Sequence, residues 1–207
     1  MKSIPIGRLL RGSVKGFVIG CTVDEVLAPH FGGMVRVPLD EKIKTVGMIY
    51  DIQVADDGLV RQLAGAAEVA PSTIQDAQIN RNVPLEISVL SLGYFEGDQI
   101  SHRLPPRPPL SLDVISLCAS EDMRGFTGRG YGYFRHLLHD RELPLADLLA
   151  VHLPEAAQVH PGEQAGSWLE GALRELTALL QDDYDRLMRV MNAVQEQLPR
   201  DEHGRVK

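Results

Sequence analysis

Cysteines and long apolar runs are scarce in this sequence. Only Cys21 and Cys118 occur among its 207 residues, far apart and with no CxxC pair. This spacing indicates neither a disulfide framework nor a cysteine zinc site, so we expect two reduced core thiols. No apolar stretch reaches the roughly 18 residues that a membrane span requires, and no run of signal-peptide length follows the N-terminus. We therefore expect a soluble, cytoplasmic protein that contacts no membrane.

Recognisable catalytic motifs are missing as well. The chain has no GxxxxGK[ST] phosphate loop, which excludes the usual ATPases, and no HExxH zinc motif or GxSxG nucleophile turn. His136 and His139 lie three residues apart on a predicted helix, but a metal would need a third ligand from elsewhere. We expect no catalytic residue, no metal site and no cofactor. The alternative is an enzyme with a composite site at a subunit interface.

Basic charge is also in short supply. The formal net charge is −7, whereas a duplex-binding surface normally shows a basic excess. The first 45 residues are the exception, with seven Lys or Arg against four acids. If the chain binds nucleic acid, we expect it to use cations of this region together with a later Gly-rich stretch. These candidate contacts are Lys15, Arg36, Lys42, Lys44, Arg129 and Tyr131.

Short runs rich in Val and Ile, separated by Gly, Pro and Asp, fill the first part of the chain and predict β-strands joined by turns. We expect strands at Gly16–Thr22, Met34–Pro38, 45–54, 83–94, 99–104 and 112–118. Alternation in the second of these predicts one face in the core and one in water. Residues 56–82 break the pattern with a turn and short helices. The predicted fold class is α+β, beginning with a small closed β-barrel over residues 1–122 that carries these inserted helices.

Two stretches of unusual composition lie at the end of the predicted barrel and just after it. Residues 104–110 hold four prolines in five positions, which favours a stiff segment crossing the barrel surface. A ligand for a Pro-recognising domain is the alternative. Residues 125–133 are dense in glycine and predict a flexible connection out of the barrel. Their Arg and aromatic side chains could instead stack on single-stranded nucleic acid.

The rest of the chain has helical periodicity. Residues 123–166 are expected to hold the Gly-rich connection and short helices, with a break at Pro144 and a polar linker from Pro154. Over residues 167–199, apolar residues at intervals of three or four predict one long amphipathic helix. A single helix cannot bury such a stripe alone, so we expect it to contact a partner or a second copy. The stripe residues are Leu169, Leu173, Leu176, Leu180, Tyr184, Leu187, Met191 and Val194.

Two segments resemble a known barrel family. The run IGRLLRGSVKGFVIGCTVDEVLAPHFGGMVRVPLDEKIKTVGMIYDI and the later run VPLEISVLSLGYFEGDQISHRLPPRPPLSLDVISL are similar to the two halves of the HAS-barrel. This is the N-terminal β-barrel of HerA-type DNA-translocating ATPases, related to the N-terminal barrel of ATP synthase subunits. The resemblance implies subunit assembly and partner docking. It does not carry over ATP hydrolysis, because this chain turns helical where the family continues into a motor domain.

Three functions follow as hypotheses. The first is a non-enzymatic barrel protein for self-assembly or for docking to a larger protein partner, such as a DNA-processing, HerA-like ATPase complex. The second is a barrel that binds single-stranded DNA or RNA. The third is an accessory protein in RNA maturation, because barrels of ribosome-assembly and guide-RNA proteins show similar Gly-Val patterns.

Overall fold

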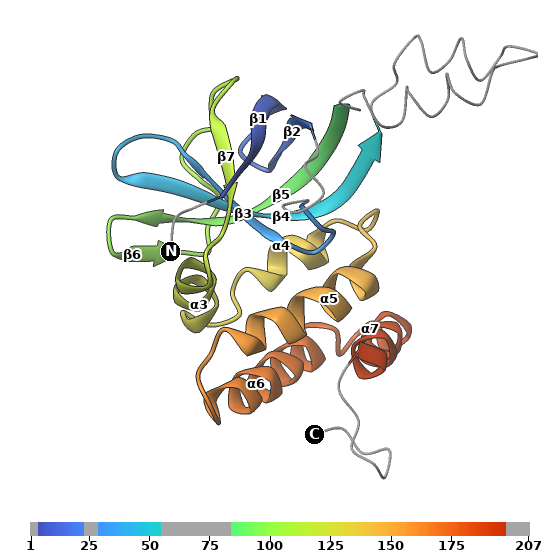
Figure 1. Cartoon of the computed structure of the whole chain (residues 1–207). Coiled ribbons are helices and arrows are strands. Elements are labelled where there is room, and N and C mark those ends of the chain that lie inside the picture. The colour runs from blue at the N-terminus through green and yellow to red at the C-terminus, as the bar shows by residue number, and fades with distance from the viewer. Residues whose placement is uncertain (1–3, 23–28, 55–83, 198–207) are drawn as a thin grey trace, which may run out of the picture.

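The computed structural model describes residues 4–22, 29–54 and 84–197, which form a barrel half and a helical half (Figure 1). The strands are β1 (Pro5–Gly12), β2 (Gly16–Thr22), β3 (Met34–Pro38), β4 (Ile43–Val54), β5 (Pro84–Glu96), β6 (Gln99–Ser101) and β7 (Val114–Leu117). The helices are α3 (Ser120–Gly128), α4 (Phe134–His139), α5 (Leu145–Gln158), α6 (Gln164–Leu179) and α7 (Tyr184–Gln197). The short helices predicted within residues 56–82 lie outside the described residues. No described helix has the length and apolar character needed to cross a membrane.

Six strands close into an antiparallel barrel. Their order is β2-β1-β7-β3-β4-β5, and pairing of β2 with β5 completes the ring. The short strand β6 pairs only with the end of β5, in a hairpin. Closure removes the unpaired sheet edges, and in a barrel of this size side chains fill the interior. The predicted α+β fold with an N-terminal closed barrel is confirmed.

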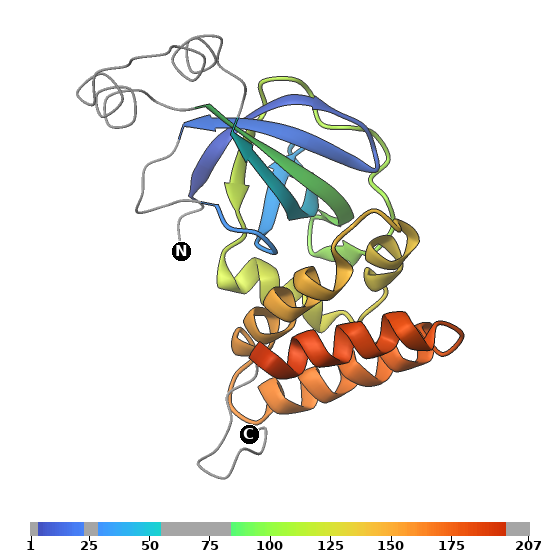
Figure 2. The same ribbon diagram turned by 90° about the vertical axis from the view of Figure 1, so that its right-hand side faces the viewer.

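Strands β3 and β4 are buried on both faces. Because side chains alternate along a strand, Val35 and Val37 of β3 fill the barrel interior, whereas Met34 joins the core beneath the helices. In β4, Ile49 lies inside the barrel, and Met48 lies on the helix side. The prediction that one face of β3 meets water is therefore wrong for Met34, because the helical half covers the outside of this part of the barrel (Figure 2).

In the helical half the structure agrees with the predicted break at Pro144 and differs from the predictions for Pro154 and for the Gly-rich stretch. Pro144 separates α4 from α5, as the sequence predicts. Pro154, however, lies inside α5, which continues to Gln158 where a linker was predicted. The predicted Gly-rich connection is also wrong in part, because α3 extends through Gly128. Only then does Gly130, at a φ of +108°, turn the chain toward α4.

The single long helix predicted over residues 167–199 is wrong, because this region forms α6 and α7 joined by a short turn. The Oδ1 atom of Asp183 accepts a hydrogen bond from the backbone N–H of Arg186 at 3.1 Å. This contact satisfies a free N–H in the first turn of α7, as an N-cap residue does. Both helices pack against α5, so their apolar faces are covered largely from within the chain.

Candidate functional site

Four exposed aliphatic side chains lie on the neighbouring strands β1 and β7 and on the turn before β7, and we call this group the apolar rim. Their exposed fractions are 44% for Leu10, 69% for Leu110, 66% for Leu112 and 40% for Val114. Leu10 lies on β1, and the other three lie on β7 and in the turn that precedes it. Backbone pairing joins the two segments, with Arg8 opposite Val114. Exposed apolar side chains gathered in this way mark a contact surface more often than scattered ones do.

The turn 110–113 holds Leu112 in an unusual conformation. The carbonyl of Leu110 accepts the N–H of Asp113 at 3.1 Å, and Leu112 has a φ of +72°. A type II turn has this conformation at its third residue, a position that favours Gly or Asn over a branched side chain. Two further bonds fix the turn, because Leu112 N–H donates to the Leu9 carbonyl at 2.8 Å and Arg8 Nη1 donates to the Leu112 carbonyl at 3.0 Å.

The apolar rim lies far from the helical half. In Figure 1 the start of β7 and the turn before it are at the end of the barrel opposite α5, α6 and α7, and Figure 2 shows the same separation. The helices therefore leave this surface uncovered. The Pro-rich stretch reaches it across the outside of the barrel, as predicted. Arg107 Nη2 donates to the Leu39 carbonyl and to Asp40 Oδ2, both at 2.9 Å. The backbone N–H groups of Ile43 and Lys42, which donate to Asp40, hold the pKa of Asp40 below its usual value, and the charge of Arg107 contributes less.

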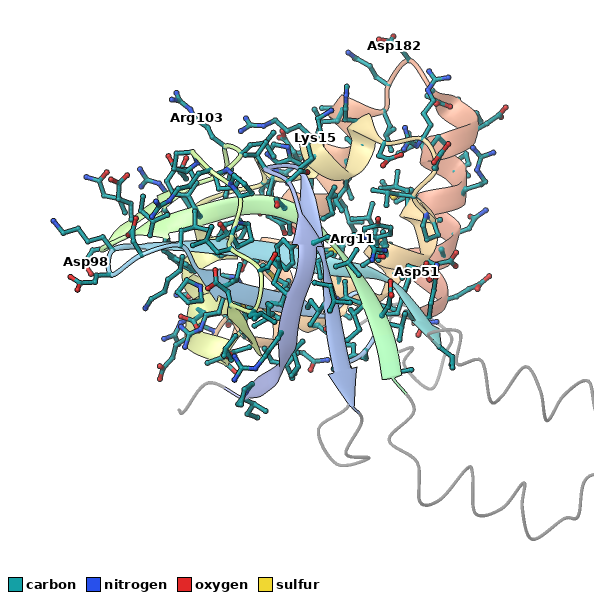
Figure 3. All side chains as sticks on the ribbon, turned by 90° about the horizontal axis from the view of Figure 1, so that it is seen from above. Arg11, Lys15, Asp51, Asp98, Arg103 and Asp182 are labelled. Atoms are coloured by element: carbon teal, nitrogen blue, oxygen red, sulfur yellow. The ribbon has the colours of Figure 1, made fainter. Side chains whose placement is uncertain are left out.

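A second feature is a pocket of about 700 Å³ between the barrel and α4, which we call the cationic pocket. It is lined by Lys15, Leu90, Ser91, Leu104, Arg135, His136, His139, Asp140, Arg141 and Glu142. Lys15 comes from the turn between β1 and β2, and the charged residues at 135–142 come from α4 and the turn after it. Figure 3 shows Lys15 and Arg103 on the same side of the barrel. Segments far apart in the sequence thus meet around one cavity.

Hydrogen bonds hold the walls of the cationic pocket in place. The Ser91 N–H donates to the Lys15 carbonyl at 2.9 Å, which ties β5 to the turn carrying the lysine. His136 Nε2 donates to the His102 carbonyl at 2.9 Å, and Arg135 donates to the same oxygen. Burial lowers the pKa of His136, and nearby Arg135 lowers it further. At neutral pH His136 therefore carries its single proton on Nε2.

The residues predicted to contact nucleic acid do not form one surface. Lys15 lines the cationic pocket, whereas Lys42 and Lys44 lie at the β3–β4 turn, where Lys44 pairs with Phe95 of β5. Since Lys15 adjoins Leu90 and Ser91, about five residues along the same strand from Phe95, the separation is roughly 15 Å. Arg36 is already paired, because its Nη1 lies 2.7 Å from Asp122 Oδ2.

Arg129 is exposed beside Asp98 and Gln99 of the β5–β6 hairpin. Tyr131 is half-buried and donates its hydroxyl proton to the Trp168 carbonyl at 2.8 Å. Its ring packs against Phe134 and Trp168. The structure therefore brings neither Arg36 nor Tyr131 to a free surface that a base could stack on.

The predicted apolar stripe is mostly an internal contact. Leu176, Leu180 and Val194 are buried in the core of the chain, so their side chains are not presented to a partner. Leu169, Leu173, Leu187 and Met191 are half-buried, and Tyr184 is 68% exposed. The reason is the break between α6 and α7, which lets both helices turn the same sequence stripe toward α5.

The cysteines and histidines considered in the sequence do not form a metal site within the described residues. Both cysteines are free thiols, and burial raises the pKa of each. Within residues 4–22, 29–54 and 84–197, no group of three or more His, Cys, Asp or Glu could hold a metal ion. His136 and His139 do share the cationic pocket. Sequence reasoning missed the apolar rim and Arg135 and Arg141 of the pocket, although leucines directly after a Pro-rich loop were an available signal.

With the geometry established, the chain was compared with known proteins. No family model matches it, and no curated protein does. The resemblance of two segments to the HAS-barrel therefore stays a prediction, and the function must be argued from the surfaces of this chain.

Proposed function

We propose that this chain is a non-enzymatic barrel protein that docks onto a larger protein partner through the apolar rim. The observation that carries the proposal is the exposure of Leu110 and Leu112, each about two thirds exposed, on a turn with the unfavourable φ of Leu112. At this position leucine adopts a positive φ less readily than glycine or asparagine does, and its side chain is apolar. Its side chain gains free energy only if a partner removes it from water.

Charge at the apolar rim favours a different protein over a second copy as the occupant. Arg8 is exposed and forms no ion pair with any described residue, so its remaining N–H groups can donate to a carboxylate of a partner. Asp113 is half-buried and its Oδ2 already accepts the Leu110 N–H at 2.8 Å. In a two-fold contact between rims, residues 110–114 of a second copy would offer Arg8 only this carboxylate, which is already hydrogen-bonded. A partner segment with aliphatic side chains beside a carboxylate complements this surface.

The resemblance to the HAS-barrel supports a specific partner class. In that family the barrel serves subunit assembly and docking, so we propose a DNA-processing ATPase of the HerA type as the partner. The closed six-strand barrel is compatible with this role.

Isothermal titration of the full chain with a purified HerA-type ATPase from the same organism tests the proposal. We expect binding that weakens by about tenfold or more in Leu110→Ser/Leu112→Ser, because two aliphatic side chains lose their burial. The matched control is Leu179→Ser/Tyr184→Ser, which removes two exposed apolar side chains from the helical half and should bind like the parent. Absence of binding by the parent chain, or equal weakening in both variants, would overturn the proposal.

Light scattering of the chain alone tests the competing occupant. We expect a monomer at micromolar concentration. A dimer that the rim variant dissociates and the control does not would show that the occupant is a second copy. The nucleic-acid alternative has less support, since its contact residues are dispersed; tight binding of a labelled single-stranded oligonucleotide that falls steeply with salt would favour it instead.

A further inference from the structure

The cationic pocket has the properties of a small-molecule site, and the apolar rim does not explain it. Its volume of about 700 Å³ lies within the range of ligand pockets in proteins. It lies at the junction of the barrel and the helical half, and none of its lining residues belongs to the apolar rim. Three cations line it, Lys15, Arg135 and Arg141, in a chain whose net charge is −7. Asp140 and Glu142 also line it, so with both histidines counted as neutral the formal charge of the lining is +1, opposite in sign to that of the whole molecule.

None of the three cations of the cationic pocket forms an ion pair with the two lining carboxylates, Asp140 and Glu142. Lys15 and Arg141 form no ion pair with any residue that the structure describes, and Arg135 donates only to the His102 carbonyl among those residues. Of the two lining carboxylates, Asp140 has its Oδ1 occupied by the Glu142 N–H at 2.9 Å. Unpaired cations around a concave surface raise the local concentration of anions.

The turn that carries Arg141 is fixed by hydrogen bonds from α7. Arg186 of α7 donates through Nη1 to the Leu138 carbonyl at 3.0 Å and through Nη2 to the Asp140 carbonyl at 3.3 Å. The turn between β1 and β2 is fixed in the same manner, because Lys15 N–H donates to Ser13 Oγ at 3.2 Å. The backbone that carries Lys15 and the backbone that carries Arg141 are therefore both ordered before a ligand binds, which reduces the entropy lost on binding.

Ser91 does not add a donor to this pocket. It is among the lining residues, but its Oγ is fully buried. Ser91 pairs with Gly47, and a Cβ on Gly47 would meet Val89 and Phe17 of the barrel interior, so the Ser91 side chain faces the interior of the barrel. The groups that a ligand in the cationic pocket meets are therefore the cations.

We propose that the cationic pocket binds the phosphate group of a small phosphorylated molecule, with Arg141 and Lys15 as charge partners. Arginine forms paired hydrogen bonds with phosphate oxygens, and lysine supplies a point charge. Free phosphate and a phosphate ester share this chemistry. The volume of the pocket favours an ester with an attached organic group.

The test is isothermal titration of the full chain with inorganic phosphate and with adenosine monophosphate, at constant ionic strength. We expect saturable binding to both, about tenfold weaker in Arg141→Ser and in Lys15→Ser. Lys44→Ser is the matched control, because it removes one exposed cation near the start of β4 that does not line the pocket, and its affinity should equal that of the parent.

Three outcomes decide the proposal. Tighter binding of the ester than of phosphate shows that the organic group occupies the pocket, whereas equal affinity assigns the site to free phosphate. Absence of saturable binding, or an equal loss in Lys44→Ser and Arg141→Ser, overturns it, because the attraction would then be unspecific. These results are independent of the apolar rim, so failure here leaves the docking proposal standing.

Discussion

Histidine 152 should make the stability of this protein strongly dependent on pH. It lies in α5 with its side chain fully buried; its Nε2 is 2.8 Å from the Tyr133 hydroxyl, and its Nδ1 has no partner among the described residues. Burial lowers its pKa to about 4, compared with about 6.5 in an unfolded chain. Between these values the unfolded state binds more protons than the folded state. The contribution to stability is therefore complete above pH 6.5 and is lost as the pH falls toward 4.

The size of this effect follows from the two pKa values. One pKa unit corresponds to about 1.4 kcal/mol, so the full loss is about 3 kcal/mol, of which about 2 kcal/mol falls between pH 7 and pH 5. Urea unfolding followed by circular dichroism at several pH values measures it, with His152→Gln as the variant that does not titrate. Burial also lowers the pKa of His102, His136 and His160, but these groups act in both proteins. Parallel pH profiles for the two proteins would refute the reasoning.

Three further predictions concern stability. Gly171→Ala should lower the free energy of unfolding in urea by about 1–2 kcal/mol, because the added Cβ would lie 2.9 Å from Cζ of Tyr131. This loss should outweigh the higher helix propensity of Ala, so a stabilised variant would contradict the prediction. A double-mutant cycle on Arg36 and Asp122, whose side chains are 21% and 23% exposed, should give a coupling energy of about 1 kcal/mol that decreases in 1 M salt. A coupling energy of zero would show that the ion pair does not contribute to the free energy of unfolding. Leu112→Asn should raise the thermal midpoint, since relief of the positive φ is worth about 1 kcal/mol; an unchanged or lower midpoint would argue against strain.

Local signals in the sequence predicted much of the barrel. The bounds of β2 and β3 agree with the sequence prediction, because Gly and Pro punctuation and period-two alternation are both local. Strand β1 was missed. It carries Arg8 and Arg11 on its exposed side, and a register shift between Leu9 and Arg11 breaks its alternation. A β-bulge of this kind hides a strand from any test of strict period two.

The helices show where periodicity misleads. Intervals of three or four continue from α6 into α7, because both helices face α5 and need the same spacing. Only Asp183, whose side chain accepts from Arg186, marks the interruption. A single Asp is a weak signal beside a long apolar stripe, so the sequence alone favoured one helix.

The candidate surfaces depend on contacts between distant segments, and this is why the sequence did not reveal them. Leu10 and Leu112 are about one hundred residues apart, and their segments lie side by side only because β1 pairs with β7. Lys15 and Arg141 are farther apart still and meet at the cationic pocket. Local patterns cannot predict which loops of a closed barrel lie beside which helix.

Hydrogen–deuterium exchange of the full chain, with and without a purified HerA-type ATPase, tests the central claim most directly. The docking account predicts new protection in β1 and in residues 108–114, where the apolar rim lies, and unchanged exchange in α6 and α7. Protection confined to α6 and α7, or exchange that the ATPase does not alter anywhere, would contradict it.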